Sequence, residues 1–409
     1  MKFTLIKLVV ACAALLWAFA VAAEDAPRIG YVRPLVGTDG FGNVYPGAQV
    51  PFGGIQISPD TDDDYYDAAS GYKYAHKTLM GFSLNHLSGT GIPDLGDFLF
   101  MPGVGEIKLE PGTHDDPDAG YRSRYSHDEE WCSPAYYGVN LTDYGVKAEM
   151  TAAQRSGILR FTYPEADDAF ILVDMRHTLW WKCRWANLRK EDDHTITGYK
   201  LVQGWGAERH VYFVAEFSEP LDDFGARGNP HEIDGLTFDE VRSRGEQLWE
   251  RELSRFTVEG PQRVKETFYT SAYRCFLSPF LFQDADGRFR EHDKSIGRAE
   301  GFTNYTTFSF WDTYRAFHPL MNLVRADMSA DVANSMLAHY DKSVERMLPV
   351  WSFYGNETWC MIGYHAVSVL ADMIVKQVPG FDYERAFEAM KRTATNPNYD
   401  CLPEYTKLG

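Results

Sequence analysis

The hydrophobic pattern of the chain changes period near Thr237, and this change limits the possible folds more than any other feature. Between about residues 29 and 220, short apolar runs alternate with glycine and proline turn signals, which is typical of β-strands. After Thr237, apolar residues recur at helical spacing. Strands followed by successive helices predict two domains, one all-β and one all-α.

The apolar runs of the first part predict individual strands. The dense glycine and proline between Gly37 and Gly112 predict long loops, which are where binding groups are usually displayed. The expected strands are Gly53–Ile57, Asp97–Met101, Gly157–Tyr163, Ala169–Val173 and Val211–Phe217.

The second part, from Phe238 to Gly409, has room for about six helices with their loops. Successive antiparallel helices commonly wind into a double ring of twelve, the (α/α)6 barrel, so the six expected helices make up about half of such a barrel. Half a barrel would leave aromatic inner faces open to water, which soluble domains seldom tolerate. We therefore expect the sequence to stop in mid-domain. The expected helices are Glu240–Phe256, Arg263–Phe282, Trp311–Val324, Ser329–Met347, Thr358–Gln377 and Asp382–Thr393.

Charge and composition exclude some classes of function. The chain has 40 basic and 58 acidic residues, a net charge of −18, which argues against nucleic-acid binding because phosphate contacts need concentrated Lys and Arg. No basic amphipathic stretch suggests a helix at a membrane surface. Aromatic residues make up 15% of the chain. That content fits either a large core or a carbohydrate site, since sugar C–H faces stack on aromatic rings.

The N-terminus has the pattern of a secretory signal peptide. Lysines precede an apolar run, Leu8–Val21, that is too short to span a membrane and ends in the small residues Ala22-Ala23. An alternative interpretation as a lipoprotein signal uses Cys12, but leaves almost no apolar segment before it. We expect residues 1–23 to be removed and the protein to be periplasmic or extracellular. The five remaining cysteines fit neither a zinc pattern nor a disulfide framework.

Two segments of the helical part carry groups that could do chemistry. Trp311, Arg315 and His318 are expected on one helical face, with Asp312 beside them. The alternative is a surface ion pair next to a buried tryptophan. Outside these two segments, Asp284–Gly287 resembles the start of a calcium loop. It lacks the spaced ligands and the final Glu of such a loop, so a turn between two helices is favoured.

Asn356 and Glu357 open the next expected helix. Glu357 is either an N-terminal charge favoured by the helix dipole or, with Asn356, a polar group pointing into a cleft. A glycosidase needs two carboxylates, roughly 6.5–9.5 Å apart for an inverting mechanism. From the residues alone, Asp312 and Glu357 are the nominees.

Several long strings resemble the glycoside hydrolase family 92 α-mannosidases. Tyr31–Thr61 is similar to the opening segment of that family, and Ser70–Pro102 to the next one. Three later strings match family motifs in the same order: FYTSAYRCFLSPFLFQDADGRFREHD, YTTFSFWDTYRAFHPL and VWSFYGNETWCMIGYHAV. The similarity covers nearly the whole chain after the signal peptide.

The resemblance implies a multidomain β plus α protein. It places a shortened N-terminal β-sandwich at residues 24–236 and the first half of an (α/α)6 barrel at residues 237–409. It implies inverting, exo-acting hydrolysis of terminal mannose from α-mannosides such as N-glycans or mannans, helped by Ca²⁺. The substrate-binding residues that it implies are Phe41, Tyr66, Trp311, Asp312, Arg315, Asn356 and Glu357.

The resemblance also assigns chemistry to motifs that this sequence lacks. It places the general acid in an EGN motif, and the general base and calcium ligands in GNEP and GNDD segments. We therefore expect no catalytic residue and no metal ligand in this chain, and Asp312 and Glu357 become sugar-binding groups. Losing a proton-transfer partner typically forfeits about 10²–10⁴-fold in rate, so the polypeptide alone is expected to be inactive.

Two departures from the family pattern bear on the function. Tyr66 stands where the family usually has Trp, which affects recognition of the leaving sugar, and the segment between Pro220 and Gly235 is short, so strands that finish the sandwich are expected to be missing. The alternatives are a non-catalytic mannose-binding remnant or the product of a degraded gene. The sequence does not fix the linkage preference or the oligomeric state.

Overall fold

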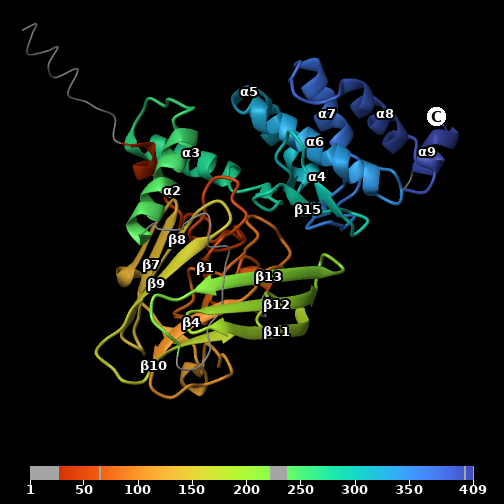
Figure 1. The fold of residues 1–409 in the computed structure, drawn as a ribbon. Coiled ribbons are helices and arrows are strands. Elements are labelled where there is room, and N and C mark those ends of the chain that lie inside the picture. The colour runs from red at the N-terminus through yellow and green to blue at the C-terminus, as the bar shows by residue number, and fades with distance from the viewer. Residues whose placement is uncertain (1–26, 64–65, 222–236, 400–401, 409) are drawn as a thin grey trace, which may run out of the picture.

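The computed structural model describes all residues except 1–26, 64–65, 222–236, 400–401 and 409. A β-rich part comes first in the chain and a helical part follows, as the two periods predicted (Figure 1). The expected signal peptide, the missing-strand segment and the expected domain boundary at residue 236 all lie outside the described residues. Within the described residues, no helix has both the length and the apolar character needed to cross a membrane.

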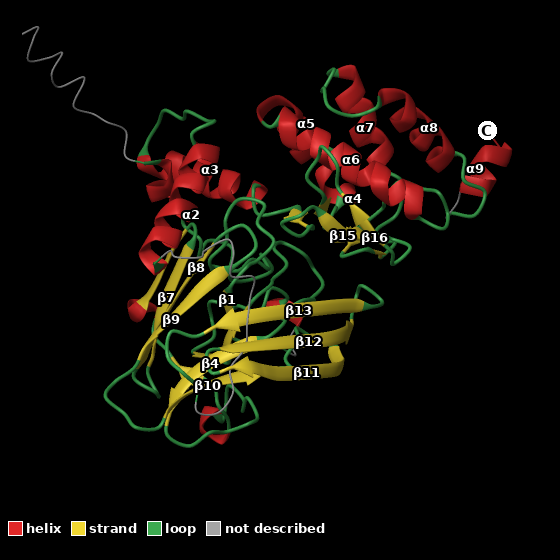
Figure 2. Cartoon of the chain, in the orientation of Figure 1, coloured by secondary structure: helices red, strands yellow, loops and turns green. Residues whose placement is uncertain are grey.

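Two four-stranded sheets share one core in the β-rich part (Figure 2). In the first sheet, four strands follow one another as an antiparallel meander: β6 (Glu130–Ser133), β7 (Tyr136–Leu141), β8 (Val146–Ala152) and β9 (Gly157–Thr162). The second sheet has the order β1 (Ser58–Asp60), β3 (Gly81–Ser83), β4 (Leu99–Val104) and β10 (Ala169–Asp174). Phe82 and Met101 of the second sheet lie in the same buried cluster as Val139 and Met150 of the first.

A third sheet extends from this body toward the helical part (Figure 1). Its strands pair in sequence order: β11 (Lys182–Asp192), β12 (Thr195–Gln203) and β13 (Arg209–Glu216). Two short strands, β2 (Thr78–Leu79) and β5 (Ser123–Arg124), pair beside the loops. Single 3₁₀ turns occur at η1 (Arg28–Tyr31), η2 (Tyr66–Ala68), η3 (Pro117–Ala119) and η4 (His127–Glu129).

The expected strands at 97–101, 157–163, 169–173 and 211–217 are confirmed within a few residues as β4, β9, β10 and β13. The expected strand Gly53–Ile57 is wrong. That stretch is a turn and loop, tied to its neighbour by one isolated bridge between Ala48 and Ile57, and the strand β1 begins only at Ser58. The paired glycines Gly53-Gly54 explain the error, because glycine favours turns over strand interiors.

Helices α2 (Phe238–Leu253) and α3 (Gln262–Cys275) pack at the end of the first sheet (Figure 1). Thr237 and Glu240 form a reciprocal capping box, which fixes the first turn of α2. Gly245 allows α2 to approach the sheet closely, since a Cβ there would lie 2.6 Å from Cβ of Ala135. The tertiary contact thus depends on a missing side chain.

The remaining helices form the helical part: α4 (Phe310–Thr313), α5 (Phe317–Val324), α6 (Ala326–Lys342), α7 (Ala366–Val375), α8 (Tyr383–Ala394) and α9 (Leu402–Leu408). Consecutive helices pack together, α5 on α6 and α7 on α8, and alternate helices also contact, α5 with α7 and α6 with α8. Before α4, β14 (Phe280–Leu281) pairs with β17 (Tyr305–Thr306), and the hairpin of β15 (Arg288–Arg290) and β16 (Ile296–Arg298) lies between them in the chain. A second hairpin, β18 (Ser352–Phe353) with β19 (Asn356–Glu357), lies between α6 and α7. The half-barrel expectation stays a prediction.

Prolines and glycines shorten three of the expected helices. The helix expected to reach Phe282 ends at Cys275, because Pro279 cannot continue it. The helix expected over 311–324 is split at residues 314–316. Pro319 has no N–H to donate to the carbonyl oxygen of Arg315, and its ring would clash with that oxygen in a continuous helix. The third, expected from Thr358, begins at Ala366, after a loop in which Trp359 and Gly363 have positive φ. The turn expected between helices at 284–287 instead joins the strands β14 and β15.

Candidate substrate-binding site

Glu357 lies on a strand of a tight hairpin, so its expected place at the opening of a helix is wrong. The turn residues Tyr354 and Gly355 have φ of 49° and 71°. Two successive positive values are the mark of a type I′ turn, whose twist suits a two-residue hairpin. The helix dipole therefore has no part in stabilising the Glu357 carboxylate.

Backbone N–H groups hold that carboxylate instead. Oε2 accepts a hydrogen bond from Val350 N at 2.9 Å, and Oε1 accepts from Trp351 N at 2.8 Å and Trp359 N at 3.0 Å. The side chain is only 2% exposed. Burial raises the pKa of Glu357 and outweighs the opposing effect of these donors. The group is a fixed buried acid with both oxygens already bonded.

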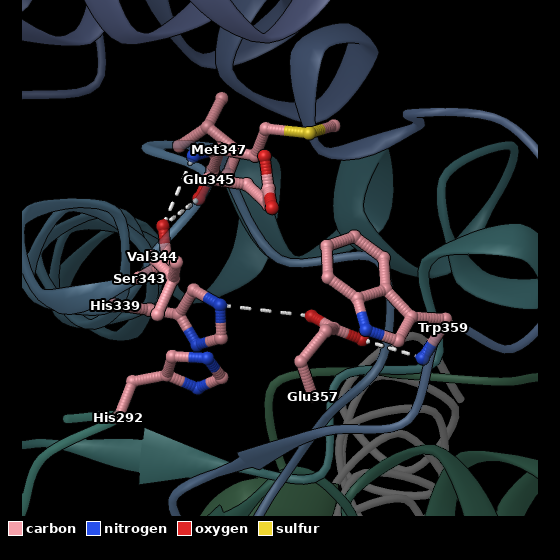
Figure 3. Close-up of a pocket in the computed structure, with 9 residues that line it drawn as sticks. His292, His339, Ser343, Val344, Glu345, Met347, Glu357 and Trp359 are labelled. Atoms are coloured by element: carbon pink, nitrogen blue, oxygen red, sulfur yellow. Dashed lines mark hydrogen bonds and ion pairs between the residues drawn. The ribbon is translucent and has the colours of Figure 1, made fainter. Parts of the chain in front are cut away.

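Figure 3 shows Glu357 facing His339 across a small pocket. Nε2 of His339 lies 3.6 Å from Oε2 of Glu357, and the His292 ring lies 4.5 Å from the His339 ring. Burial holds the pKa of His339 well below its usual range, and the neighbouring His292 lowers it further. The pocket measures about 30 Å³, which has room for a water molecule and not for a sugar.

Trp311, Asp312 and Arg315 lie on and just after the short helix α4. The ring of Trp311 is 5.2 Å from that of His365, and Tyr314 stacks on the same His365 at 4.3 Å. The guanidinium carbon of Arg315 lies 5.1 Å from the Tyr314 ring centre, and its Nε donates to the Tyr314 hydroxyl at 2.9 Å. Asp312 accepts a hydrogen bond from Ser309. These side chains form one aromatic and charged cluster.

His318 does not join this cluster, so the helical face expected for Trp311, Arg315 and His318 is wrong. The break before Pro319 turns His318 into the core of α5, where it is 3% exposed and packs against Phe310 and Phe317. Burial lowers its pKa to about 3. The residue is a neutral core histidine.

Cys360 connects the two segments that the sequence nominated. Burial raises the pKa of its thiol, and the negative charges of Asp312 and Glu357 add to that shift. Asp312 and Glu357 thus both act on the Cys360 thiol through their charge. His365, which the sequence reasoning missed, belongs to the same place: its Nε2 is buried without a hydrogen-bond partner among the described residues. Its only signal in the sequence was its position in the string GYHAV.

Asn356 uses its whole amide to join the two parts of the molecule. Its nitrogen donates to the carbonyl oxygens of Glu208, Phe353 and Tyr354 at 3.1–3.2 Å. Its oxygen accepts from Nζ of Lys294 at 2.7 Å. Nearby, the ring of Trp205 packs 4.3 Å from that of Trp351, across the same junction. In this arrangement Asn356 positions Glu357.

In the β-rich part, Phe41 lies on a loop and Tyr66 begins the 3₁₀ turn η2, and they are 88% and 55% exposed. Neither forms a hydrogen bond or ring contact with the other five candidates among the described residues. Tyr66 contacts Trp180 edge to face, with ring centres 6.3 Å apart, and Trp180 is itself 46% exposed. The sequence reasoning missed Trp180, because its exposure beside Tyr66 is not visible in a sequence pattern. The two rings offer an aromatic surface.

In the part of the chain that the structure describes, the carboxylate, imidazole and thiol groups that come together do not fit the Ca²⁺ that the resemblance implies. One group there brings three metal-ligating side chains together, and it consists of Asp62, His76 and His114. Calcium takes six to eight oxygen ligands, whereas this group offers two nitrogens and one carboxylate. The calcium expectation stays a prediction.

Comparison with known proteins assigns the family. Residues 31–253 match the glycosyl hydrolase family 92 N-terminal domain, and residues 225–409 match the glycosyl hydrolase family 92 catalytic domain. The chain is 63% identical to the family 92 alpha-mannosidase BT3965 from Bacteroides thetaiotaomicron, solved in complex with mannoimidazole, with a TM-score of 0.90. That match covers 93% of this chain and 57% of BT3965, so the chain spans little more than half of its relative.

More distant relatives agree on the fold. The inverting mannosidase BT2199 from the same organism is 24% identical with a TM-score of 0.76, covering 94% of this chain and 58% of that one. An uncharacterized secreted glycosidase of Arthroderma benhamiae is 30% identical over 149 residues, 35% of this chain and 18% of that protein. Because the N-terminal family model alone matches more than half of the residues, the chain belongs to glycosyl hydrolase family 92.

Proposed function

We propose that this chain is part of an inverting, exo-acting α-mannosidase that releases terminal mannose from α-mannosides such as N-glycans or mannans. The observation that carries the proposal is the 63% identity to the alpha-mannosidase BT3965 across 93% of the chain. The binding of mannoimidazole by that relative supports a mannose subsite here. In this proposal, the present chain supplies the sugar-binding groups. The general acid, the general base and the Ca²⁺ ligands lie in the part of the family fold that this chain does not span.

The proposed sugar-binding groups fall into two sets. Trp311, Asp312 and Arg315 form the mannose-binding cluster, and the charges of Asp312 and Glu357 both act on Cys360. Phe41 and Tyr66 contribute from the loops of the β-rich part, with Trp180 enlarging the aromatic surface at Tyr66. Glu357 supports the site as a structural group, because its oxygens accept hydrogen bonds from three backbone N–H groups and tie the hairpin to residues 350, 351 and 359.

We also propose export, with residues 1–23 as the signal peptide. The secreted relative in Arthroderma benhamiae supports this part. Peptide sequencing of the N-terminus after expression in a bacterial host should give Glu24 as the first residue.

Activity and binding assays on the purified chain test the main proposal. Isothermal titration with mannoimidazole should show binding, and release of mannose from an α-mannobioside should be undetectable. Measurable hydrolysis would show that the chain carries its own acid and base. Failure of the folded chain to bind mannoimidazole, judged against glucose as a control sugar, would remove the proposed mannose site.

A further inference from the structure

Two imidazoles and a carboxylate converge on the β-rich part, away from the aromatic cluster around Trp311. Asp62 follows β1, His76 precedes β2, and His114 lies in the loop between β4 and η3. One ligating atom from each lies within 4.8 Å of the other two. Nε2 of His114 is 3.1 Å from Oδ2 of Asp62, and the two imidazole rings are 4.1 Å apart. Three loops that are distant in the chain thus bring nitrogen and oxygen ligands to one point.

The Thr61 hydroxyl gives His76 a hydrogen-bond partner for its Nδ1. The hydroxyl of Thr61 donates to the carbonyl oxygen of Gly71 and accepts from the backbone N–H of Lys73. When Nδ1 of His76 donates to Thr61 Oγ1, 2.9 Å away, the lone pair of His76 lies on Nε2. A metal-bound histidine is usually held by its other nitrogen in this way.

His114 has a corresponding partner for its Nδ1. Thr78 Oγ1 lies 3.0 Å from that atom and also accepts from Arg122 at 2.9 Å. When Nδ1 of His114 donates to Thr78, the lone pair of His114 lies on Nε2, facing Asp62. In the alternative tautomer, Nε2 carries the proton and donates to Asp62, and Nδ1 accepts from Arg122 at 3.3 Å. A cation and this hydrogen bond therefore compete for the same two atoms.

The local charge favours a cation. Asp60 ends β1 and Asp62 and Asp63 follow it, so three carboxylates stand close together in this segment, against the guanidinium of Arg122, whose Nη1 lies 3.3 Å from Nδ1 of His114. Asp60 is compensated by His86 and His177, each 2.8 Å away. Asp62 and His114 are 19% and 31% exposed, so a dissolved ion can reach them.

We propose that Asp62, His76 and His114 bind a divalent cation of the zinc class, with the fourth position of a tetrahedron open to water. Ligands at 2.0–2.1 Å from a tetrahedral zinc ion lie about 3.3 Å from one another, close to the 3.1 Å that separates His114 from Asp62. Imidazole and carboxylate ligands select zinc over calcium, which takes six to eight oxygen ligands. The bound ion joins the loops that carry Asp62, His76 and His114, and thereby braces the part of the molecule next to Tyr66.

Metal titration of the purified full chain tests this site. After dialysis against a chelator, Co²⁺ should bind with one equivalent and give the absorption bands of a tetrahedral site, and Zn²⁺ should displace it. Zn²⁺ should also raise the melting temperature, because a ligand that binds only the folded state stabilises it. Ca²⁺ alone, at the same concentration, should produce neither effect.

Three variants locate the ion. His76→Gln, His114→Gln and Asp62→Asn should each weaken Zn²⁺ binding by at least about tenfold. The matched control is His210→Gln, which alters a histidine that is 21% exposed and paired to Glu208 without a second imidazole. Circular dichroism before metal addition shows whether each variant is folded.

The possible results separate cleanly. Loss of the Co²⁺ bands in the three folded variants, and not in the control, establishes the site. A folded wild-type chain that binds no Co²⁺ or Zn²⁺ overturns the proposal in favour of a plain His114–Asp62 hydrogen bond. If metal binding is unchanged in each of the three variants, or is lost in the His210 variant, the proposal is overturned and the ion binds elsewhere. None of these results depends on sugar binding, so the proposed function stands or fails separately.

Discussion

The carboxylate of Glu357 lies 3.6 Å from Nε2 of a neutral, buried His339, and its two oxygens accept three backbone hydrogen bonds from residues 350, 351 and 359. The hairpin that carries Glu357 is thereby tied to the loop before α7. A side chain that the sequence presents as a reactive acid is thus a structural centre of the proposed sugar site.

Replacing Glu357 with Gln should destabilise the folded chain by about 1–3 kcal/mol. In the wild type, the backbone N–H of Val350 donates to Oε2 of Glu357. If the side-chain NH₂ of Gln takes the place of that oxygen, the Val350 N–H is left buried without an acceptor. Urea unfolding monitored by tryptophan fluorescence measures the change. Glu345→Gln, in the same pocket lining, is the control and should leave stability nearly unchanged. Equal stability of the wild type and the Glu357 variant would contradict the structural role.

Replacing Asn356 with Asp should destabilise the junction between the two parts more than replacing Asp312 with Asn. The amide nitrogen of Asn356 donates to three carbonyl oxygens, and a carboxylate oxygen in its place would meet them without a proton. We expect a loss of about 2–3 kcal/mol. Thermal unfolding of both variants gives the comparison, and a melting temperature unchanged in the Asn356 variant would contradict the assigned contacts.

Stability should fall as the pH drops below about 6.5, partly because of His318. Its pKa is lowered to about 3 in the folded chain, so between pH 6.5 and 3 the unfolded chain takes up a proton that the folded one does not. The contribution is fully present above the unfolded pKa and is lost as the pH falls, at a slope of at most about 1.4 kcal/mol per pH unit. The variant His318→Gln should show a shallower dependence in urea unfolding across this range. An unchanged slope would mean that His318 is charged or exposed.

Replacing Gly245 with Ala should cost about 1–3 kcal/mol through overpacking. The new Cβ would meet the Cβ of Ala135 at 2.6 Å, and neither atom belongs to a flexible side chain. Gly30→Ala is the matched control, because nothing lies within 4 Å of its added Cβ. Denaturant midpoints of the two variants should differ, with only the Gly245 variant below the wild type.

Replacing Trp180 with Ala should weaken binding of an α-mannobioside more than binding of mannose, with little effect on stability. The ring is 46% exposed beside Tyr66, so its loss removes a stacking surface and hardly changes the core. Trp131, 42% exposed on β6, gives the control variant Trp131→Ala. Isothermal titration with both sugars measures the effect. Equal losses in the two variants would show that Trp180 has no specific role.

The order of strands before helices could be read from the sequence, because a change from period 2 to period 3.6 is a local property. Four of the five expected strands and the helices α2, α6 and α8 occur near their expected places. The errors at residues 53–57, 314–316 and 358–365 share one cause. Glycine, proline and positive-φ residues interrupt an apolar pattern there without changing its period.

For the site, the sequence determined which segments matter, and the tertiary structure decided what each residue does. Trp311, Asp312, Arg315, Asn356 and Glu357 were named from strings of residues, yet Glu357 and Asn356 proved to be fully bonded and His365 and Trp180 were missed. Likewise, Asp62, His76 and His114 have no motif spacing at all. Hydrogen-bond satisfaction and convergence of distant loops depend on long-range packing, which no local pattern encodes.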